Sequence, residues 1–174
     1  YRKQEPLNVQ AYWQAEWAPN GEGVYFISDR DEDYHIYSLA LGSDSPKRIT
    51  QGDWAVFEFA VFDHGVYFLA NKGRLEERQI FRVDLDGGEP RQMSHRAGTH
   101  RPDYSPNGRF AADYFSNDGT PYDLLVTELD SSKPGVEQER QVTHSPIEEF
   151  SRYHWVEAEY VTFPSVVDGV TLTG

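Results

Sequence analysis

One pattern of strands and turns occurs three times in this chain, and its spacing limits the folds that the chain can adopt. Each copy has a turn that ends in glycine before a strong apolar run, at Gly21, Gly65 and Gly108. Each copy closes on a hydroxyl residue, at Thr50, Ser94 and Thr143. The glycines are 44 and 43 residues apart, and the hydroxyl residues are 44 and 49 apart, the longer interval containing the turn at 131–135. Extra residues in a turn cost little free energy, so the chain is an array of repeats.

The runs inside each copy are typical of β-strands. They are rich in Val, Tyr, Phe and Ile, alternate partly with period two, and are bounded by turn residues, whereas helix signals are nearly absent. Asn20-Gly21 and Asn107-Gly108 suit tight hairpins, and Asp86-Gly87-Gly88 suits the turn between the third and fourth strands of its copy. Four strands at this period predict one blade of a β-propeller.

The predicted fold class is therefore all-β, a partial β-propeller of about three four-stranded blades at approximately 12–60, 61–103 and 104–155. Blades stack because one sheet cannot cover both of its own faces. Since a closed propeller typically needs four to eight blades, the outer faces require further sequence or another chain. We expect all four tryptophans to pack between blades, at Trp13, Trp17, Trp54 and Trp155.

Composition narrows the function classes. Aromatic residues make up 14% and apolar residues 38% of the 174 residues, which favours a folded domain. The formal net charge of −13 argues against nucleic acid or an anionic membrane as partner. The absence of cysteine excludes disulfides, thiolate metal sites and a cysteine nucleophile. No apolar run approaches the roughly 20 residues of a membrane span and no signal peptide is visible, so the sequence leaves the compartment open, whether periplasmic, secreted or cytoplasmic.

The ordered blocks in the repeats resemble the propeller of the dipeptidyl peptidase IV and prolyl oligopeptidase family of serine peptidases. Block 25–37 is similar to that family's Ser-acid-Arg-Asp-Gly-aromatic-His-Leu-Tyr stretch, and block 49–56 to its Leu-Thr-Lys-Gly-Asp-Trp-Glu-Val segment. Further similar blocks follow at 75–88, 98–100, 104–110 and 113–116. The resemblance spans about residues 12–174. It departs from the family at Asp31-Glu32-Asp33, where the family usually has an Asp-Gly turn, and in the longer turn at 131–139.

The tail at 159–174 resembles the strand pair by which these enzymes pass from the propeller into the α/β-hydrolase domain. Independently, alternation at Tyr160 and Thr162 and at Val170 and Leu172, around Asp168-Gly169, predicts a hairpin. The expected domains are a propeller segment at 1–155 and the start of the hydrolase domain at 156–174. We read the chain as the last three blades of a propeller in a longer protein.

The sequence offers no catalytic residues for serine hydrolysis. It lacks the Gly-x-Ser-x-Gly elbow on which such a nucleophile sits, and the resemblance implies that the serine, aspartate and histidine follow Gly174. Ser28, Ser105 and Ser151 are therefore not expected to act as nucleophiles, and the chain alone should be inert. The resemblance also implies that the glutamates that hold the substrate's amino terminus precede these blades, so substrate-binding residues stay unknown.

Two acidic pairs imitate that glutamate pair. Glu76-Glu77 and Glu148-Glu149 both lack the aromatic context that precedes the pair in the family, so we expect solvated surface pairs.

No metal or cofactor is expected. Asp29, Asp31 and Asp33 have the spacing of calcium-loop ligands, but Tyr34 and Ala40 stand where the loop needs glycine and glutamate, which favours a charged hairpin tip. The six histidines form no metal-binding motif, at His35, His64, His95, His100, His144 and His154. His95 and His100 are close in sequence to Asp103, as a loop between blades would also produce.

The resemblance implies that the parent protein hydrolyses peptides and releases amino-terminal X-Pro or X-Ala dipeptides, with the propeller gating a buried active site. Its partner would then be a peptide substrate, and the exposed blade faces would meet a second copy or the remainder of the propeller and hydrolase domain. Two other readings stay open. One is a non-enzymatic propeller scaffold that binds proteins, and the other is an inactive homologue of the peptidase.

Overall fold

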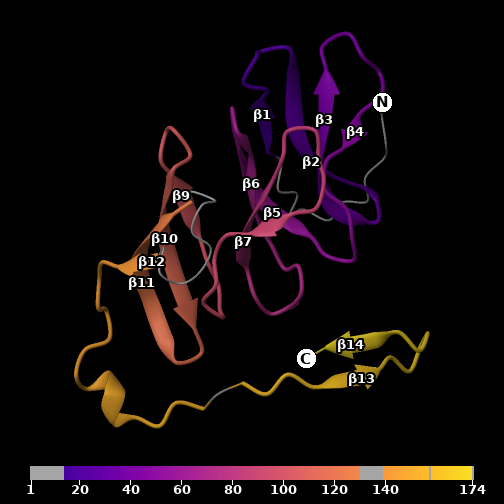
Figure 1. Ribbon diagram of the computed structural model, residues 1–174. Coiled ribbons are helices and arrows are strands. Elements are labelled where there is room, and N and C mark those ends of the chain that lie inside the picture. The colour runs from indigo at the N-terminus through magenta and orange to yellow at the C-terminus, as the bar shows by residue number, and fades with distance from the viewer. Residues whose placement is uncertain (1–13, 130–138, 157, 174) are drawn as a thin grey trace.

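The computed structural model describes residues 14–129, 139–156 and 158–173, and its regular structure is almost entirely β (Figure 1). Blade 1 contains β1 (Ala15–Trp17), β2 (Gly23–Asp31), β3 (Asp33–Ala40) and β4 (Lys47–Arg48). Blade 2 contains β5 (Val56–Phe62), β6 (Gly65–Ala70), β7 (Gln79–Val83) and β8 (Arg91–Gln92). Blade 3 contains β9 (Pro102–Tyr104), β10 (Phe110–Asn117), β11 (Thr120–Glu128) and β12 (Glu139–Gln141). Each blade is a four-stranded antiparallel sheet in which neighbouring strands follow one another in sequence, so the predicted fold class is confirmed.

The tail leaves blade 3 through one turn of 3₁₀ helix, η2 (Phe150–Arg152), and ends in the two-stranded hairpin of β13 (Thr162–Pro164) and β14 (Thr171–Thr173). Figure 1 shows this tail passing beneath the three sheets, which lie side by side in chain order. Among the described residues, no helix is long and apolar enough to cross a membrane.

The first strands of blades 2 and 3 begin earlier than the spacing of the repeats suggests. The expected divisions at 60/61 and 103/104 fall inside β5 and β9, which begin at Val56 and Pro102. The physical reason is that the first strand of a blade precedes its glycine turn and pairs back across it, as Val61 pairs with Val66. The hairpin, and not the residue count, therefore sets where a blade starts.

The predicted hairpin turns form where the Asn-Gly pairs stand. Gly21 and Gly108 have φ values of 72° and 63°, and their amides donate to the carbonyls of Ala18 and Ser105 at 2.8 Å. Glycine adopts this left-handed conformation at little cost because it has no Cβ.

Strand pairing aligns the three blades residue by residue. Ile36 of blade 1 pairs with Ile27, Ile80 of blade 2 with Leu69, and Leu124 of blade 3 with Tyr114. The face that a blade turns toward the next one, here called its forward face, carries four apolar residues in blade 2: Tyr67, Leu69, Ile80 and Met93. They are at most 5% exposed and belong to the same core cluster as Ala111 and Leu129 of blade 3. The aligned positions in blade 3 are Ala112, Tyr114, Leu124 and Val142, of which Tyr114 is 54% and Val142 45% exposed.

The tryptophans divide between seam and surface. Trp54 is buried in the cluster between blades 1 and 2, where it stacks on Phe68 with ring centroids 5.8 Å apart, as predicted. The prediction is wrong for Trp17 and Trp155, which are 65% and 52% exposed. In β1 the side chain of Glu16 reaches blade 2 by accepting from the Val61 amide, so period-two alternation turns Trp17 to the other face. Trp13 lies outside the described residues.

Candidate functional site at the seam between blades 2 and 3

A polar contact joins the third strand of every blade to the hydroxyl residue that follows its fourth strand. The three pairs are His35 with Thr50 at 3.1 Å, Gln79 with Ser94 at 2.6 Å, and Asp123 with Thr143 at 2.8 Å. In each pair the hydroxyl oxygen also accepts from the next amide in the third strand, that of Ile36, Ile80 or Leu124. We call this arrangement the buckle. It fixes the outer edge of the sheet, where the fourth strand is only two or three residues long.

In each buckle, the side chain from the third strand also contacts a backbone group of the loop that follows, and that group is a donor or an acceptor as the side chain requires. The amide Nε2 of Gln79 donates to the carbonyl of Arg96 at 2.8 Å, and Nε2 of His35 lies 3.0 Å from the carbonyl of Gly52. Asp123 has no donor, and there the loop presents the amide of Ser145 at 2.7 Å instead. Burial lowers the pKa of His35, and this outweighs the opposing hydrogen bond to Gly52. His35 is therefore neutral, with Nε2 protonated and Nδ1 accepting from the hydroxyl of Thr50.

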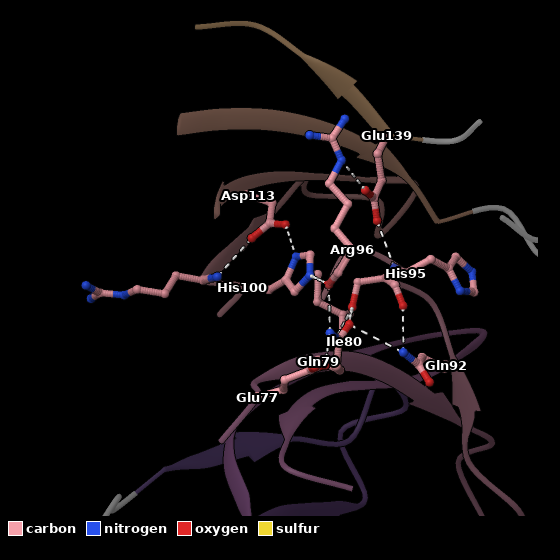
Figure 2. A network of polar contacts seen from close by, with 11 residues as sticks. Glu77, Gln79, Ile80, Gln92, His95, Arg96, His100, Asp113 and Glu139 are labelled. Atoms are coloured by element: carbon pink, nitrogen blue, oxygen red, sulfur yellow. Dashed lines mark hydrogen bonds and ion pairs between the residues drawn. The ribbon is translucent and has the colours of Figure 1, made fainter. Parts of the chain in front are cut away.

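The seam between blades 2 and 3 contains a buried histidine and aspartate in contact (Figure 2). Nδ1 of His100 donates to Oδ2 of Asp113 at 2.5 Å, and neither side chain is exposed. On the other side of the ring, Nε2 lies 2.9 Å from the carbonyl oxygen of Arg96. The second carboxylate oxygen of Asp113 accepts from the amide of Arg101 at 2.8 Å. Strand pairing aligns Asp113 with Phe68, so a carboxylate here takes the place of the ring on which Trp54 stacks in the previous seam.

An ion pair closes the same seam. Nε of Arg96 lies 3.0 Å from Oε2 of Glu139, whose side chain is fully buried, and Oε1 of Glu139 accepts from the amide of His95 at 2.9 Å. Figure 2 shows the contacts of His100 with Asp113 and of Arg96 with Glu139 on either side of the loop that joins β8 to β9, with Gln79 below them. The loop is thereby held to both blades.

This network has the parts of an acid–base pair but no substrate access. His100 is fully buried and both of its ring nitrogens already face protein acceptors, so it cannot take a proton from a bound molecule. The hydroxyl of Ser94, which belongs to the same network, is bound to Gln79 and to the amide of Ile80. Among the described residues these groups therefore form a structural joint.

A pocket of about 590 Å³ opens beside the joint, with apolar and polar residues in its lining. Its lining includes Arg96, Phe115, Asn117, Asp123, Gln141 and His144. Asp123 already accepts from Thr143, Ser145 and Gln141. The carboxylate that could have held a cationic ligand is thus already bound by three donors of the protein itself.

A second pocket, of about 390 Å³, lies partly on the forward face of blade 3. Its lining includes Glu58, Arg101, Asp103, Tyr114 and Tyr122. Burial raises the pKa of Glu58 above its ordinary value despite the charge of Arg101 nearby.

The two acidic pairs singled out in the sequence differ: Glu148 is exposed, but the side chains of Glu76 and Glu77 are only 16% and 12% exposed, so the latter pair is not solvated as expected. Glu76 and Glu77 both contact Arg74, at 2.8 and 3.0 Å, and Glu77 also accepts from Gln79. Glu148 pairs with Arg152 at 3.0 Å in the exposed tail. Glu77 thereby joins the polar network of Figure 2 through Gln79, whereas Glu148 is not part of it.

The acidic hairpin tip is organised by one tyrosine. The hydroxyl of Tyr37 donates to Oδ2 of Asp31 at 2.6 Å, and burial together with this bond raises the pKa of Tyr37 to about 12. Glu32 completes the turn with a φ of 87°. Among the residues that the structure describes, no group of three His, Cys, Asp or Glu side chains could hold a metal ion.

Two of the six histidines are buried. His100 contacts Asp113, and His35 belongs to the buckle of blade 1. His100 does not contact Asp103, which pairs with Ala112 and so lies on the opposite face of the sheet from Asp113. The sequence reasoning missed Asp113 as the partner of His100, and it missed the buckles. Two signals were available: polar residues recur at exact 44-residue spacing at 35, 79 and 123, and a carboxylate stands at 113 where the aligned strand has phenylalanine.

Comparison with known proteins defines the class of this domain. A model of the dipeptidyl peptidase IV N-terminal region matches residues 3–122, and the chain belongs to this family. An uncharacterized protein of Agrobacterium fabrum (strain C58), Atu1656, is 29% identical over 102 residues, which cover 58% of this chain and 34% of that protein. The crystal structure of Porphyromonas gingivalis dipeptidyl peptidase 4 superimposes with a TM-score of 0.75 at 21% identity, over 91% of this chain and 22% of that one. The chain thus spans about a third of the relative and under a quarter of the solved structure.

Proposed function

We propose that this chain is a propeller segment of a dipeptidyl-peptidase-IV-like serine peptidase, in which the blades shape access to an active site formed by another part of the protein. The observation that carries this proposal is the family match over residues 3–122, joined to a described fold of three stacked blades. The segment itself contributes no triad, since its sequence has no Gly-x-Ser-x-Gly elbow. The parent would bind peptides and release X-Pro or X-Ala dipeptides from their amino termini.

The tail supports the division into a propeller segment at 1–155 and the start of a hydrolase domain at 156–174. The predicted hairpin forms, with Phe163 paired to Leu172 and Gly169 in its turn at a φ of 75°. Phe163 and Leu172 are 48% and 43% exposed. An isolated two-stranded hairpin is marginally stable in water, so we assign the hairpin to a larger sheet, that of the hydrolase.

The test compares the chain with the longer protein that contains it. We expect the longer protein to hydrolyse a glycyl-prolyl chromogenic substrate, and replacement of its elbow serine by alanine to abolish the reaction. The 174-residue chain, assayed at the same molar concentration, should match the buffer rate. A longer protein with no serine elbow after Gly174, or with no activity beside an intact elbow, would overturn the proposal in favour of the inactive homologue.

A protein-binding scaffold is the second candidate, because the forward face of blade 3 exposes Tyr114, Tyr122 and Val142 together. In the peptidase this face would meet the remainder of the propeller, the hydrolase domain or a second copy. If the longer protein lacks the elbow and a separate protein protects this face from hydrogen exchange, the scaffold replaces the peptidase.

A further inference from the structure

The two seams of the molecule are built from different chemistry. The seam between blades 1 and 2 stacks Trp54 on Phe68 and places the edge of the neutral His35 against Trp54, with centroids 4.8 Å apart. The seam between blades 2 and 3 places His100 against Asp113. The first contact has no charge to gain or lose near neutral pH, whereas the second depends on a titrating group.

The surroundings of His100 determine how many protons its ring carries. A carboxylate oxygen faces Nδ1 and a backbone carbonyl faces Nε2, and both are pure acceptors. A neutral imidazole has only one N–H, so it would leave one of these contacts as two lone pairs facing each other. The imidazolium satisfies both at once. Burial lowers the pKa of His100, but the hydrogen bond and the charge of Asp113 outweigh burial and raise it above the ordinary value.

Every charged group that faces this ring favours the protonated form or is neutralised by a partner. Asp113 approaches from β10, and Glu139 adds its negative charge from β12. The guanidinium of Arg96, in the loop before His100, is paired with Glu139 at 3.0 Å. The ring of Phe115 covers the remaining side with centroids 5.0 Å apart.

The backbone around His100 joins blade 2 to blade 3. The amide of His100 donates to the carbonyl of Arg78 in blade 2 at 2.9 Å, and the amide of Arg78 donates to Gly98 at 3.1 Å. One residue earlier, Thr99 and Ser116 of blade 3 exchange two hydrogen bonds of 2.8 and 3.0 Å. Residues 98–100 therefore bridge the two sheets, and the ring of His100 anchors this bridge.

We propose that His100 is held as an imidazolium that clamps blade 2 to blade 3, and that this seam loosens when His100 loses its proton while the seam between blades 1 and 2 does not. The clamp is a pH-dependent joint on one side of the propeller. It does not depend on peptidase activity, so it stands or falls independently of the proposed function.

The first experiment reads the proton directly in the unmodified 174-residue chain. Long-range ¹⁵N–¹H spectra of the histidine rings, recorded from acid to alkaline pH, should show His100 with both nitrogens protonated at neutral pH. His35 should lose its charge at lower pH than His100 does. A single N–H on His100 at neutral pH, in either tautomer, overturns the proposal.

The second experiment reads the seam by amide hydrogen exchange, corrected for the intrinsic pH dependence. Through the titration of His100, protection of the amides of Arg78, Thr99 and His100 should fall about tenfold, while that of Ile49 in blade 1 stays constant. Unchanged protection at all three seam amides would also overturn the proposal.

Substitution separates the clamp from general stability. Asp113→Asn keeps the shape but removes the charge, so His100 should titrate at lower pH and the seam should open there. Asp103→Asn, on the opposite face of the same sheet, is the matched control and should leave the titration unchanged. If Asp113→Asn does not fold, the ring spectra and exchange of the unmodified chain decide the matter.

Discussion

At the scale of single residues, two buried hydroxyls, those of Tyr104 and Thr127, have no hydrogen-bond partner among the described residues. Oγ1 of Thr127 is buried without a hydrogen bond among the described residues. Strand pairing and the 44-residue period align Thr127 with Val83, which is buried on the equivalent face of blade 2. A hydroxyl that gives up its water without a replacement hydrogen bond lowers stability.

Thr127→Val should therefore stabilise the chain by about 1 kcal/mol, because valine keeps the shape and removes the unpaired group. Urea unfolding at constant m-value measures the change. Thr50→Val is the control: its hydroxyl serves a buckle, so the same substitution there should destabilise the chain. A loss of stability in Thr127→Val would show that the hydroxyl has a partner after all.

Glu32 adopts a backbone conformation that is unfavourable for a residue with a side chain. Its φ of 87° lies where a Cβ is disfavoured, at the position where the resemblance leads one to expect glycine. Glu32→Gly should stabilise the chain by about 0.5 kcal/mol, the relieved strain less the greater freedom of glycine in the unfolded state. Thermal unfolding would detect this. Glu32→Ala, which keeps the Cβ but loses the charge, should bring no such gain.

At the scale of elements, the buckle explains why three different side chains occupy one position. Histidine and glutamine each offer an acceptor to the hydroxyl and a donor to a carbonyl, while aspartate offers only acceptors and meets an amide. The loop that follows the fourth strand has adjusted its backbone to the side chain. This match predicts what happens when the buckle side chain of one blade is replaced by that of another.

Gln79→Glu should destabilise the chain by about 2 kcal/mol near neutral pH, because the carboxylate would face the carbonyl of Arg96 and the carboxylate of Glu77 without a donor. The loss should shrink in acid, where a protonated glutamate regains one donor. Gln79→His supplies the side chain of blade 1 and should cost less than about 1 kcal/mol. Denaturant unfolding at two pH values tests both, and equal stability of Gln79→Glu and the unmodified chain would refute the donor requirement.

The blades and their turns could be predicted from the sequence because both rest on local signals. Period-two apolar runs and the Asn-Gly turns act within a few residues, and the structure places hairpins at Gly21 and Gly108. The seam could not be predicted in this way. In a single strand Asp113 is read as a solvent-facing residue, and only the packing of blade 2 on β10 buries it against His100. The prediction for Trp17 was wrong for a related reason, because the exposure of Trp17 depends on which face of β1 meets blade 2.

At the scale of the whole molecule, the forward faces of blades 2 and 3 differ in how far they are covered. The forward face of blade 2 is closed by blade 3, while the aligned face of blade 3 has no cover among the described residues. Met93 is 3% exposed and its counterpart Val142 is 45% exposed. The same position thus contributes to the core in one blade and to the surface in the next.

Met93→Ala should destabilise the 174-residue chain by about 3 kcal/mol, since it removes a side chain from a packed seam. Val142→Ala should cost less than about 1 kcal/mol, because half of the lost contact is with water. Denaturant unfolding at several protein concentrations is the measurement. If Val142→Ala cost as much as Met93→Ala, and only at high concentration, a second copy of the chain would be covering the forward face of blade 3, since stability lent by a partner rises with its concentration. Equal costs at all concentrations would instead mean that the face is closed within one chain.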